Sequence, residues 1–257
     1  MTNKSDRNFD SIAAKFQRNI YQSSKGQLRQ AVLMRDLNGL ALLSAPCHIL
    51  DVGGGQGQIA LQLAERGHQL LLTDISADML ALAEQQVQAR QLMAQVSLAQ
   101  LSLQQLALRP ERYALVLCHA VLEWLADPAE AIVQLRSLLL PGGVLSLMFY
   151  NVHAKRFSNI LYGNFDYVQA GLQVKKTVSL SPQNPILPEQ VEQWCSQNGL
   201  AILSKTGVRC FHDYLRDRRL QQSHYPQLLE LEMAYNQQEP YLLLGRYQHW
   251  LLQADNN

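Results

Sequence analysis

The stretch Ile49-Leu-Asp-Val-Gly-Gly-Gly-Gln-Gly-Gln58 decides the fold of this chain. Its apolar residues form the end of a buried strand, and its glycines can adopt positive φ angles and let the backbone approach a ligand closely. From Gln58 to Arg66 the apolar spacing is helical, and Gly67 is a typical residue after a helix end. The sequence therefore predicts a ligand over the end of a strand, against the amides of a helix N-terminus.

Two carboxylates help to identify the ligand that this turn would bind. Asp51 lies two positions before the first glycine, where it repels a pyrophosphate but suits a cation or a neutral amino acid. The next apolar run ends in Asp74, which suits the ribose hydroxyls of any adenosine cofactor. Gly55-x-Gly57-x-x-Ala60 is a weak match to the dinucleotide fingerprint. A nicotinamide cofactor, and a glycine-rich turn in another kind of α/β protein, stay open as alternatives.

These features, with Pro141-Gly-Gly143 before a later apolar run, resemble the class I S-adenosylmethionine (SAM) methyltransferases. Those enzymes carry Asp-x-Gly-x-Gly on their first strand, an acid ending the second, and Pro-Gly-Gly before the fifth. The resemblance implies SAM as cofactor and a Rossmann-like α/β fold with a seven-stranded, mostly parallel sheet and a hairpin of the last two strands. The alternation of strand and helix patterns after Cys47 favours a parallel, doubly wound sheet by itself.

A chain of 257 residues suits one large α/β domain, and we find neither a repeat nor a linker. We expect a single methyltransferase domain, divided into an N-terminal helical lid (1–45), a SAM-binding core (46–151), a substrate-side insertion (152–185), and a C-terminal helix and strand hairpin (186–257). The expected elements include helices at 6–20, 25–43, 77–91, 127–140 and 188–198, and late strands at 201–211 and 241–253. The stretch 102–106 is expected to be a loop.

Composition excludes several classes of protein. With 47% apolar and 17% charged residues the chain is globular, and a net charge of +1 gives no global attraction to nucleic acid. Its four cysteines form no Cys-x-x-Cys pattern, so we expect no metal site and a reducing, cytoplasmic location. Neither a secretory signal nor a membrane-spanning apolar run is evident, so we expect no membrane partner.

Sequence blocks along nearly the whole chain resemble one bacterial family, the tRNA 5-carboxymethoxyuridine methyltransferases. The blocks are Arg7-Asn-Phe-Asp10, Lys25-Gly-Gln-Leu-Arg-Gln30, His119-Ala-Val-Leu-Glu-Trp124, Gly142-Gly-Val-Leu-Ser-Leu-Met-Phe-Tyr-Asn151, Gly163-Asn-Phe-Asp-Tyr-Val-Gln-Ala-Gly171, Thr206-Gly-Val-Arg209, Phe211-His-Asp-Tyr-Leu215, Gln238-Glu-Pro-Tyr241 and Leu244-Gly-Arg-Tyr247. The resemblance implies SAM-dependent esterification of the carboxymethoxy group on the wobble uridine of tRNA anticodons.

Family cofactor contacts fall, by position, on Arg29, Gly53, Gly54, Asp74, Leu103, Gln104 and His119. Asp51 and Gly55 join this set because they belong to the glycine turn. Arg29 on a helical lid would pair with the methionine carboxylate of SAM. Leu103 would pack on the adenine and Gln104 would offer its amide to the base edge, although the acid common in this loop is absent. His119 would line the cofactor near the sulfonium or serve as a structural histidine.

A carboxylate acceptor simplifies the chemistry. Its pKa is roughly 3–4, so it is ionised at pH 7, and the departing thioether is neutral, so neither a base nor an acid is required. Positioning of the acceptor is then the main contribution, worth ~7–11 kcal/mol. The candidate positioning residues follow the late strands: Tyr150, Asn151, Arg209, His212 and Tyr214.

The segment 151–185 interrupts the strand–helix alternation and is rich in basic and aromatic residues. Lys155, Arg156, Lys175 and Lys176 are candidates for contacts with tRNA phosphates, and Phe165 and Tyr167 for stacking on a base. A solvated loop with aromatic anchors explains the same pattern. Two further functions remain open: a SAM-dependent O-methyltransferase for a small molecule, with His119 or His212 as base, and a SAM-binding subunit without catalysis.

Overall fold

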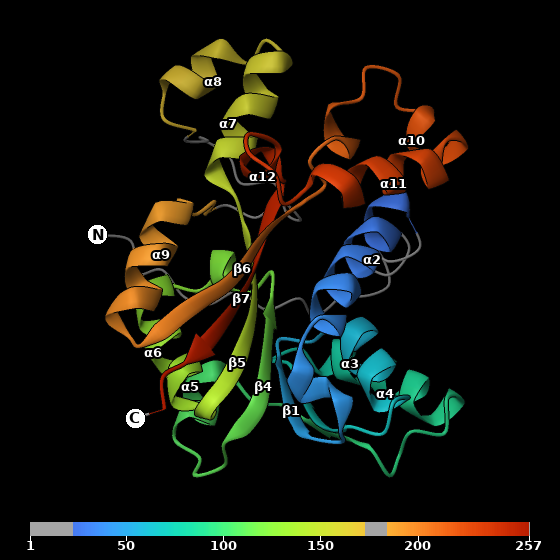
Figure 1. Ribbon diagram of the computed structural model, residues 1–257, viewed down its shortest axis with the longest axis vertical. Helices are drawn as coiled ribbons and strands as arrows, with labels where there is room; N and C mark the ends of the chain where they lie inside the picture. Colours follow the sequence, from blue (N-terminus) through green and yellow to red (C-terminus); the bar gives the residue numbers. More distant parts are fainter. Residues whose placement is uncertain (1–22, 173–183, 257) are drawn as a thin grey trace.

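Alternating apolar residues in the central strands build a sheet that is covered on both faces. The computed structural model describes residues 23–172 and 184–256. In these ranges seven strands form one sheet in the order β3-β2-β1-β4-β5-β7-β6 (Figure 1). The strands are β1 (His48–Val52), β2 (Gln69–Thr73), β3 (Val96–Ala99), β4 (Tyr113–His119), β5 (Leu139–Tyr150), β6 (Leu200–Val208) and β7 (Tyr247–Ala254).

The direction of the strands confirms the predicted sheet. The strands from β3 to β5 run parallel to their neighbours, whereas β7 lies between β5 and β6 and is antiparallel to both. The fold is therefore Rossmann-like and mostly parallel, with the last two strands paired as a hairpin. Because the carboxyl ends of β1, β2, β3 and β4 meet at one edge, that edge is where a ligand binds in such a sheet.

The helices divide between the two faces according to the strand period of two. Ile49 belongs to a core cluster with α2, α3, α4 and α11, whereas Leu50 belongs to a second cluster with α5, α6 and α9. The helices are α2 (Ser24–Asn38), α3 (Gln58–Ala64), α4 (Ala77–Ala89), α5 (Leu103–Ala107), α6 (Pro128–Ser137), α7 (Val152–Leu161), α8 (Phe165–Gln169), α9 (Pro188–Gln197), α10 (Leu220–Ser223), α11 (Tyr225–Tyr235) and α12 (Tyr241–Leu244). Short 3₁₀ turns are η2 (Ala41–Ser44), η3 (Leu122–Trp124) and η4 (His212–Tyr214).

Local capping chemistry explains why two helix starts were predictable. The Ser76 hydroxyl accepts a hydrogen bond from the backbone N–H of Met79 at the start of α4. Asp127 accepts hydrogen bonds from the backbone N–H groups of Ala129 and Glu130, and Pro128 occupies the first helical position of α6.

The structure differs from the sequence prediction in several elements. The expected loop 102–106 is the short helix α5, because Ser102 and Gln105 form a reciprocal capping box. The helix expected to reach residue 140 ends at Ser137, since the chain from Leu139 already pairs with β4. The expected strand 241–253 begins later, because residues 241–244 form α12.

The segment after β5, expected to be a loop, folds into α7 and α8. These helices project beyond the strand ends next to α12, at the top of Figure 1. The described ranges contain no helix long and apolar enough to cross a membrane. The expected helix at 6–20, Lys175 and Lys176 lie outside the described residues. The single domain, its four parts and the lid role of residues 1–45 stay predictions, and α2 itself is packed into the core through Leu28 and Val32.

Candidate functional site

The glycine turn after β1 has no room for side chains. A Cβ added to Gly54 would lie 2.5 Å from Oδ2 of Asp51, and one added to Gly53 would lie 2.7 Å from a methyl group of Val121. Gly53 also has a φ of +64°, a conformation that favours glycine. The turn is therefore fitted tightly between the carboxylate beneath it and the segment that follows β4.

Asp74 holds this turn in place from the neighbouring strand. Its Oδ2 accepts a hydrogen bond of 3.0 Å from the backbone N–H of Gly55, and its Oδ1 accepts one of 2.9 Å from the N–H of Ser76. A carboxylate of this kind also accepts hydrogen bonds from the hydroxyls of a ribose. The acid predicted to bind ribose therefore also links β2 to the turn.

Asp51 differs from the prediction in how it meets the site. It lies beneath the turn, with 4% of its surface exposed, and it is not among the residues that line the pocket. Burial, and then the nearby charge of Asp74, raise the pKa of Asp51 to about 7. Asp51 can therefore stabilise a bound cation electrostatically when it is ionised, but its side chain does not line the pocket.

A pocket opens at the carboxyl ends of β1, β2, β3 and β4. Its lining consists of Val52, Gly53, Asp74, Ile75, Leu101, Ser102, Leu103, Gln104, Ala120, Val121, Trp124 and Leu125. The predicted set Gly53, Asp74, Leu103 and Gln104 is thus brought together, while Ile75 and Trp124 were missed although each adjoins a recognised motif. Apolar walls beside one carboxylate suit an adenosine, whose base is flat and whose ribose offers hydroxyl donors.

Arg29 and His119 come from distant parts of the chain, on α2 and at the end of β4. The charge of Arg29 acts on the ionisation of His119, Glu123 and Tyr247. His119 ends β4, directly before the lining residue Ala120, and its Nε2 lies 2.8 Å from the Ser146 hydroxyl. Burial is the main cause that lowers the pKa of His119 well below its usual value, and the charge of Arg29 acts in the same direction, so the ring is neutral.

Glu123 is a buried carboxyl that sequence reasoning did not single out. It lies on η3 and is fully buried. Burial raises its pKa to about 8, although the backbone of Glu123 and Tyr150 and the charge of Arg29 act in the opposite direction. Glu123 lies in the block 119–124 that resembles the family, and this position in the sequence could have pointed to it.

Two arginines share one carboxylate at the ends of β6 and β7. Nη2 of Arg209 donates a 2.8 Å hydrogen bond to Oδ2 of Asp213, and Nε of Arg246 lies 4.0 Å from the same oxygen. Burial acts to raise the pKa of Asp213, but Arg209, His212 and Arg246 together hold it well below its usual range. The two guanidiniums and one carboxylate leave one excess positive charge.

Both arginines rest on tyrosine rings. Tyr150 ends β5 and pairs with Tyr247, which begins β7, and the ring centroids are 5.6 Å apart. Cζ of Arg246 lies 4.8 Å from the Tyr150 ring centroid, and Cζ of Arg209 lies 5.5 Å from that of Tyr247. Burial raises the pKa of Tyr150, so its phenol stays protonated and can donate a hydrogen bond. Arg246 was missed, although it stands in the block 244–247.

Three predicted positioning residues have structural roles. The Asn151 amide donates to the carbonyls of Leu243 and Gly245, and its oxygen accepts from a backbone N–H, so its hydrogen-bonding groups are engaged. His212 is fully buried, with its ring nitrogens bonded to Ser24 and Asp213. The Tyr214 hydroxyl donates to the Leu244 carbonyl. These contacts are structural, and a role of Asn151, His212 or Tyr214 in positioning the acceptor stays a prediction that none of them supports.

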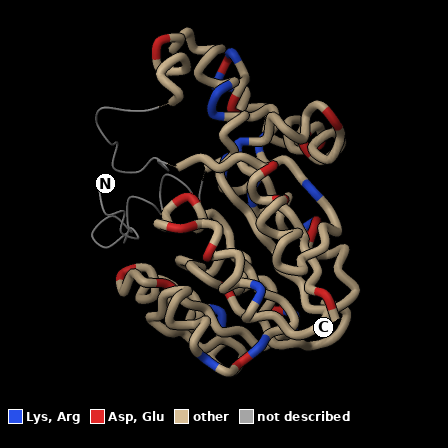
Figure 2. The backbone as a smooth tube through the Cα atoms, turned by 90° about the vertical axis from the view of Figure 1, so that its left-hand side faces the viewer, with Lys and Arg blue, Asp and Glu red and all other residues tan. Residues whose placement is uncertain are grey.

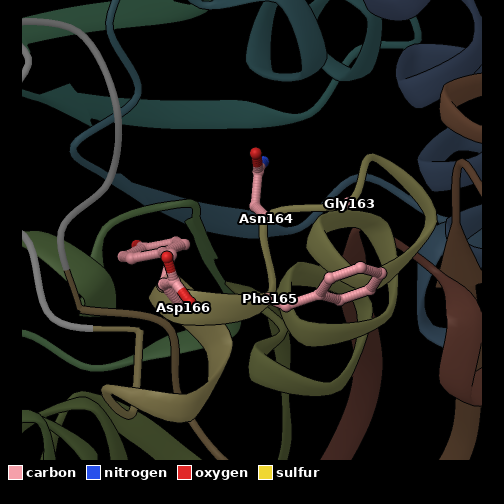
Figure 3. A pocket seen from close by; sticks show the side chains of 5 residues that line it. Gly163, Asn164, Phe165 and Asp166 are labelled. Carbon is pink, nitrogen blue, oxygen red and sulfur yellow. The ribbon is translucent and has the colours of Figure 1, made fainter.

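Lys155 of α7 lies between the tyrosine pair and Tyr167 of α8. Nζ of Lys155 is 5.9 Å from the Tyr150 ring centroid and 5.7 Å from that of Tyr167. Residues 163–167 line a second pocket, where Phe165 and Asp166 point in different directions with Asn164 between them (Figure 3). Arg156 is exposed, and 59% of Phe165 is exposed. Elsewhere the two signs of charge are intermixed along the chain (Figure 2).

Comparison with known proteins agrees with this geometry. Residues 50–147 match the family model "Methyltransferase domain". The chain is 51% identical to the tRNA 5-carboxymethoxyuridine methyltransferase of Escherichia coli strain K12, over 95% of each chain. It is 28% identical to a ubiquinone biosynthesis O-methyltransferase of Coxiella burnetii, over 63% of this chain and 66% of the relative.

Solved structures show the same fold. A magnesium protoporphyrin IX methyltransferase from Synechocystis PCC 6803 with bound SAH has a TM-score of 0.65 at 16% identity, with 96% of each chain covered. The same enzyme with bound SAM has a TM-score of 0.61 and covers 96% of this chain and 93% of that one. These structures confirm the predicted class I methyltransferase fold.

Proposed function

The chain belongs to the family of the tRNA 5-carboxymethoxyuridine methyltransferases, and we propose that it uses SAM to methylate the carboxylate of 5-carboxymethoxyuridine at the tRNA wobble position. The product is the methyl ester. The observation that carries the proposal is the pair Arg209 and Arg246, whose single shared carboxylate leaves a positive charge free for an anionic acceptor.

The residues of the pocket fit the cofactor. Asp74 is the carboxylate in its lining and would accept hydrogen bonds from the ribose hydroxyls. Leu103 with its apolar neighbours suits the adenine face, and Gln104 would contact the base edge. The cradle at Gly53 and Gly54, which a Cβ would fill, allows a close approach to the backbone. When bound, SAM supplies an activated methyl group on a cationic sulfur.

The amino-acid end of the cofactor belongs beside α2. Arg29 would pair with its carboxylate, and His119 would contact the same end, because the charge of Arg29 already acts on His119. The buried carboxyl of Asp51 lies beneath the turn and favours the cationic sulfur when ionised. These roles are proposals that follow from placement.

The acceptor carboxylate would be held by Arg209 and Arg246, with the Tyr150 phenol as a neutral donor. A carboxylate needs no base, because it is ionised at neutral pH. The chain's task is to hold one carboxylate oxygen in line with the methyl group and to exclude water, which is worth ~7–11 kcal/mol.

The tRNA would lie across α7 and α8. Lys155 joins the tyrosine pair to this surface, Arg156 is exposed for a phosphate, and Phe165 and Tyr167 offer rings to unstacked bases. Lys175 and Lys176 belong to the same proposal, although they lie outside the described residues. The four free cysteines agree with the proposed cytoplasmic location.

Methylation of a small phenol or quinol is less well supported. That reaction needs a base to take the hydroxyl proton, and His212, one of the two candidates, is enclosed. The acceptor site also carries two arginines, which a neutral phenol does not require.

The experiment offers SAM with a labelled methyl group to three acceptors: an anticodon stem-loop with 5-carboxymethoxyuridine, the same loop with uridine, and a soluble quinol. We expect label only on the first, released by mild alkali as an ester requires. Label on the quinol would support the small-molecule function. SAM binding without transfer to any acceptor would support a non-catalytic subunit.

A further inference from the structure

A line of buried hydrogen bonds connects α2 to His119 through two strands. His119 Nε2 lies 2.8 Å from Oγ of Ser146 on β5, and the same oxygen lies 2.8 Å from Nε2 of His249 on β7. Nδ1 of His249 lies 2.7 Å from Oδ2 of Asp36 on α2. Ser146 and His249 are fully buried, and Asp36 is 7% exposed. These three residues are called the relay below.

The relay begins at an ionised carboxylate. Burial acts against ionisation of Asp36, yet contacts with His249 and Arg35 lower its pKa overall. Arg35 donates to the other oxygen of Asp36 through Nη2 at 2.7 Å and Nε at 2.9 Å. Because the guanidinium of Arg35 already balances the charge of the carboxylate, and the ring of His249 is fully buried, we infer that His249 carries a single proton.

The direction of each hydrogen bond follows from this start. An ionised carboxylate only accepts, so His249 must carry its proton on Nδ1 and accept through Nε2. Ser146 has one hydroxyl proton, which it donates to His249, and it must therefore accept from His119. His119 thus carries its proton on Nε2, and its Nδ1 is left with a lone pair.

We propose that Asp36, acting through His249 and Ser146, fixes the tautomer of His119 so that its Nδ1 accepts a hydrogen bond from the α-ammonium of the cofactor's methionine part. This inference rests on the proposed SAM site. The ammonium is the appropriate donor because Arg29, the proposed partner of the adjoining carboxylate, acts on the same ring.

Helix α2 contributes to both proposed contacts with the methionine part of the cofactor. Arg29 and Asp36 are seven residues apart on this helix, which is about two turns, so they lie on the same face. One helix therefore supplies both the proposed carboxylate ligand and the group that orients the proposed ammonium ligand. Asp36, His249 and Ser146 are positioning residues, because they act through His119.

The test is Asp36→Asn, which keeps the shape and the contact with Arg35 but offers an amide donor to His249. Each hydrogen bond of the relay then reverses, and His119 presents an N–H to the ammonium. Loss of one hydrogen bond to a charged group predicts a rise of roughly 10- to 100-fold in the KM for SAM and in the Kd for SAH, with kcat changed much less.

The tautomers are read directly by ¹⁵N NMR of protein labelled at histidine nitrogens, with signals assigned by His119→Gln and His249→Gln. We expect the proton on Nε2 of His119 and on Nδ1 of His249 in the wild type, and both inverted in Asp36→Asn. The proposal is overturned if His119 carries its proton on Nδ1 in the wild type, if Asp36→Asn leaves both tautomers unchanged, or if His249 is doubly protonated.

Ser146→Ala provides a second variant that interrupts the relay without changing a charge. We expect weaker SAH binding and a mixture of His119 tautomers, with a cooperative thermal transition retained. Ser137→Ala is the matched control, because that hydroxyl bonds only to the Gln134 carbonyl on α6, and it should change neither readout. Normal SAH binding in Ser146→Ala would contradict the proposal.

Failure of the proposed function has a different signature. If SAH binds and the tautomers follow the relay while tRNA is not methylated, the relay stands and the proposed acceptor is wrong. If the wild type binds no SAH, the proposed SAM site and the role of His119 fail together.

Discussion

Tyr150 and Tyr247 face each other across β5 and β7, with ring centroids 5.6 Å apart, and each ring packs against one arginine of the proposed acceptor site. The pair exists because β7 runs antiparallel between β5 and β6, which brings the start of β7 to the end of β5. The proposed acceptor site therefore depends on the antiparallel placement of β7 in an otherwise parallel sheet.

Arg246→Gln should abolish most methyl transfer while leaving cofactor binding intact. Removing one of two cations leaves Asp213 to neutralise the other, so the acceptor carboxylate loses its net attraction. We expect kcat/KM for the modified stem-loop to fall roughly 10- to 1,000-fold, the range for loss of a charge-assisted contact. Arg219→Gln is the control, because Arg219 is exposed and paired with Asp217. Unchanged transfer by the Arg246 variant would remove it from the site.

Gly54→Ala should prevent cofactor binding, because the new methyl group would stand 2.5 Å from the Asp51 carboxylate. Gly67→Ala is a matched control of the opposite kind: φ is +91° there, but nothing lies within 4 Å of the new Cβ. We expect Gly67→Ala to lower the free energy of unfolding by about 1 kcal/mol without altering SAH affinity. Calorimetric titration with SAH separates the two, and normal binding by Gly54→Ala would be incompatible with the site.

Glu123 should make the protein less stable as pH rises. Its pKa is raised to about 8 in the folded state, against 4.5 for an ordinary glutamate. Between these values the folded protein holds a proton that the unfolded chain has lost, so the free energy of unfolding falls with increasing pH. Asp51, with its pKa raised to about 7, acts in the same direction.

Urea unfolding at pH 5 and pH 8.5 measures this effect. The wild type should lose stability between the two pH values, and Glu123→Gln, which stays neutral, should lose distinctly less. An equal loss in both proteins would mean that Glu123 does not titrate in this range.

Phe165→Ala should weaken binding of the anticodon stem-loop without affecting SAH. The ring is 59% exposed at the rim of the pocket on α8, and loss of one base stack costs roughly 1–3 kcal/mol, or about 5- to 150-fold in Kd. Leu108→Ala is the control, since that side chain is 88% exposed and lies after α5. Fluorescence anisotropy of a labelled stem-loop measures the Kd of both variants. Equal affinities of Phe165→Ala and the wild type would mean that the RNA does not contact this ring.

Lys155→Gln with Arg156→Gln should flatten the salt dependence of stem-loop binding. Each lost phosphate contact reduces the slope of log K against log salt by about 0.7–0.9. A slope that matches the wild type would show that neither residue meets a phosphate.

The sequence predicted those parts of the molecule that short-range chemistry determines. The glycine turn, Asp74, and the caps at Ser76 and Asp127 each depend on residues within a few positions or on neighbouring parallel strands. Parallel order along β3 to β4 also follows from alternation of strand and helix patterns, so the cofactor pocket was predictable.

The relay and the acceptor side could not be predicted to the same extent. Asp36 and His249 are 213 positions apart, and only the placement of β7 brings them together. Asn151 and His212 were chosen from their place after strands, but their side chains turn inward to bond to backbone and to Ser24. The direction in which each of these side chains points depends on local turns of the backbone, which no residue pattern specifies.

The most direct test of the central claim is mass spectrometry of the wobble nucleoside. Purified protein and SAM are incubated with tRNA that carries 5-carboxymethoxyuridine, and the tRNA is then digested to nucleosides. We predict that this nucleoside gains one methyl group on its carboxylate and loses it again in mild alkali. An unchanged nucleoside, or a methyl group on the base or the ribose, would contradict the account.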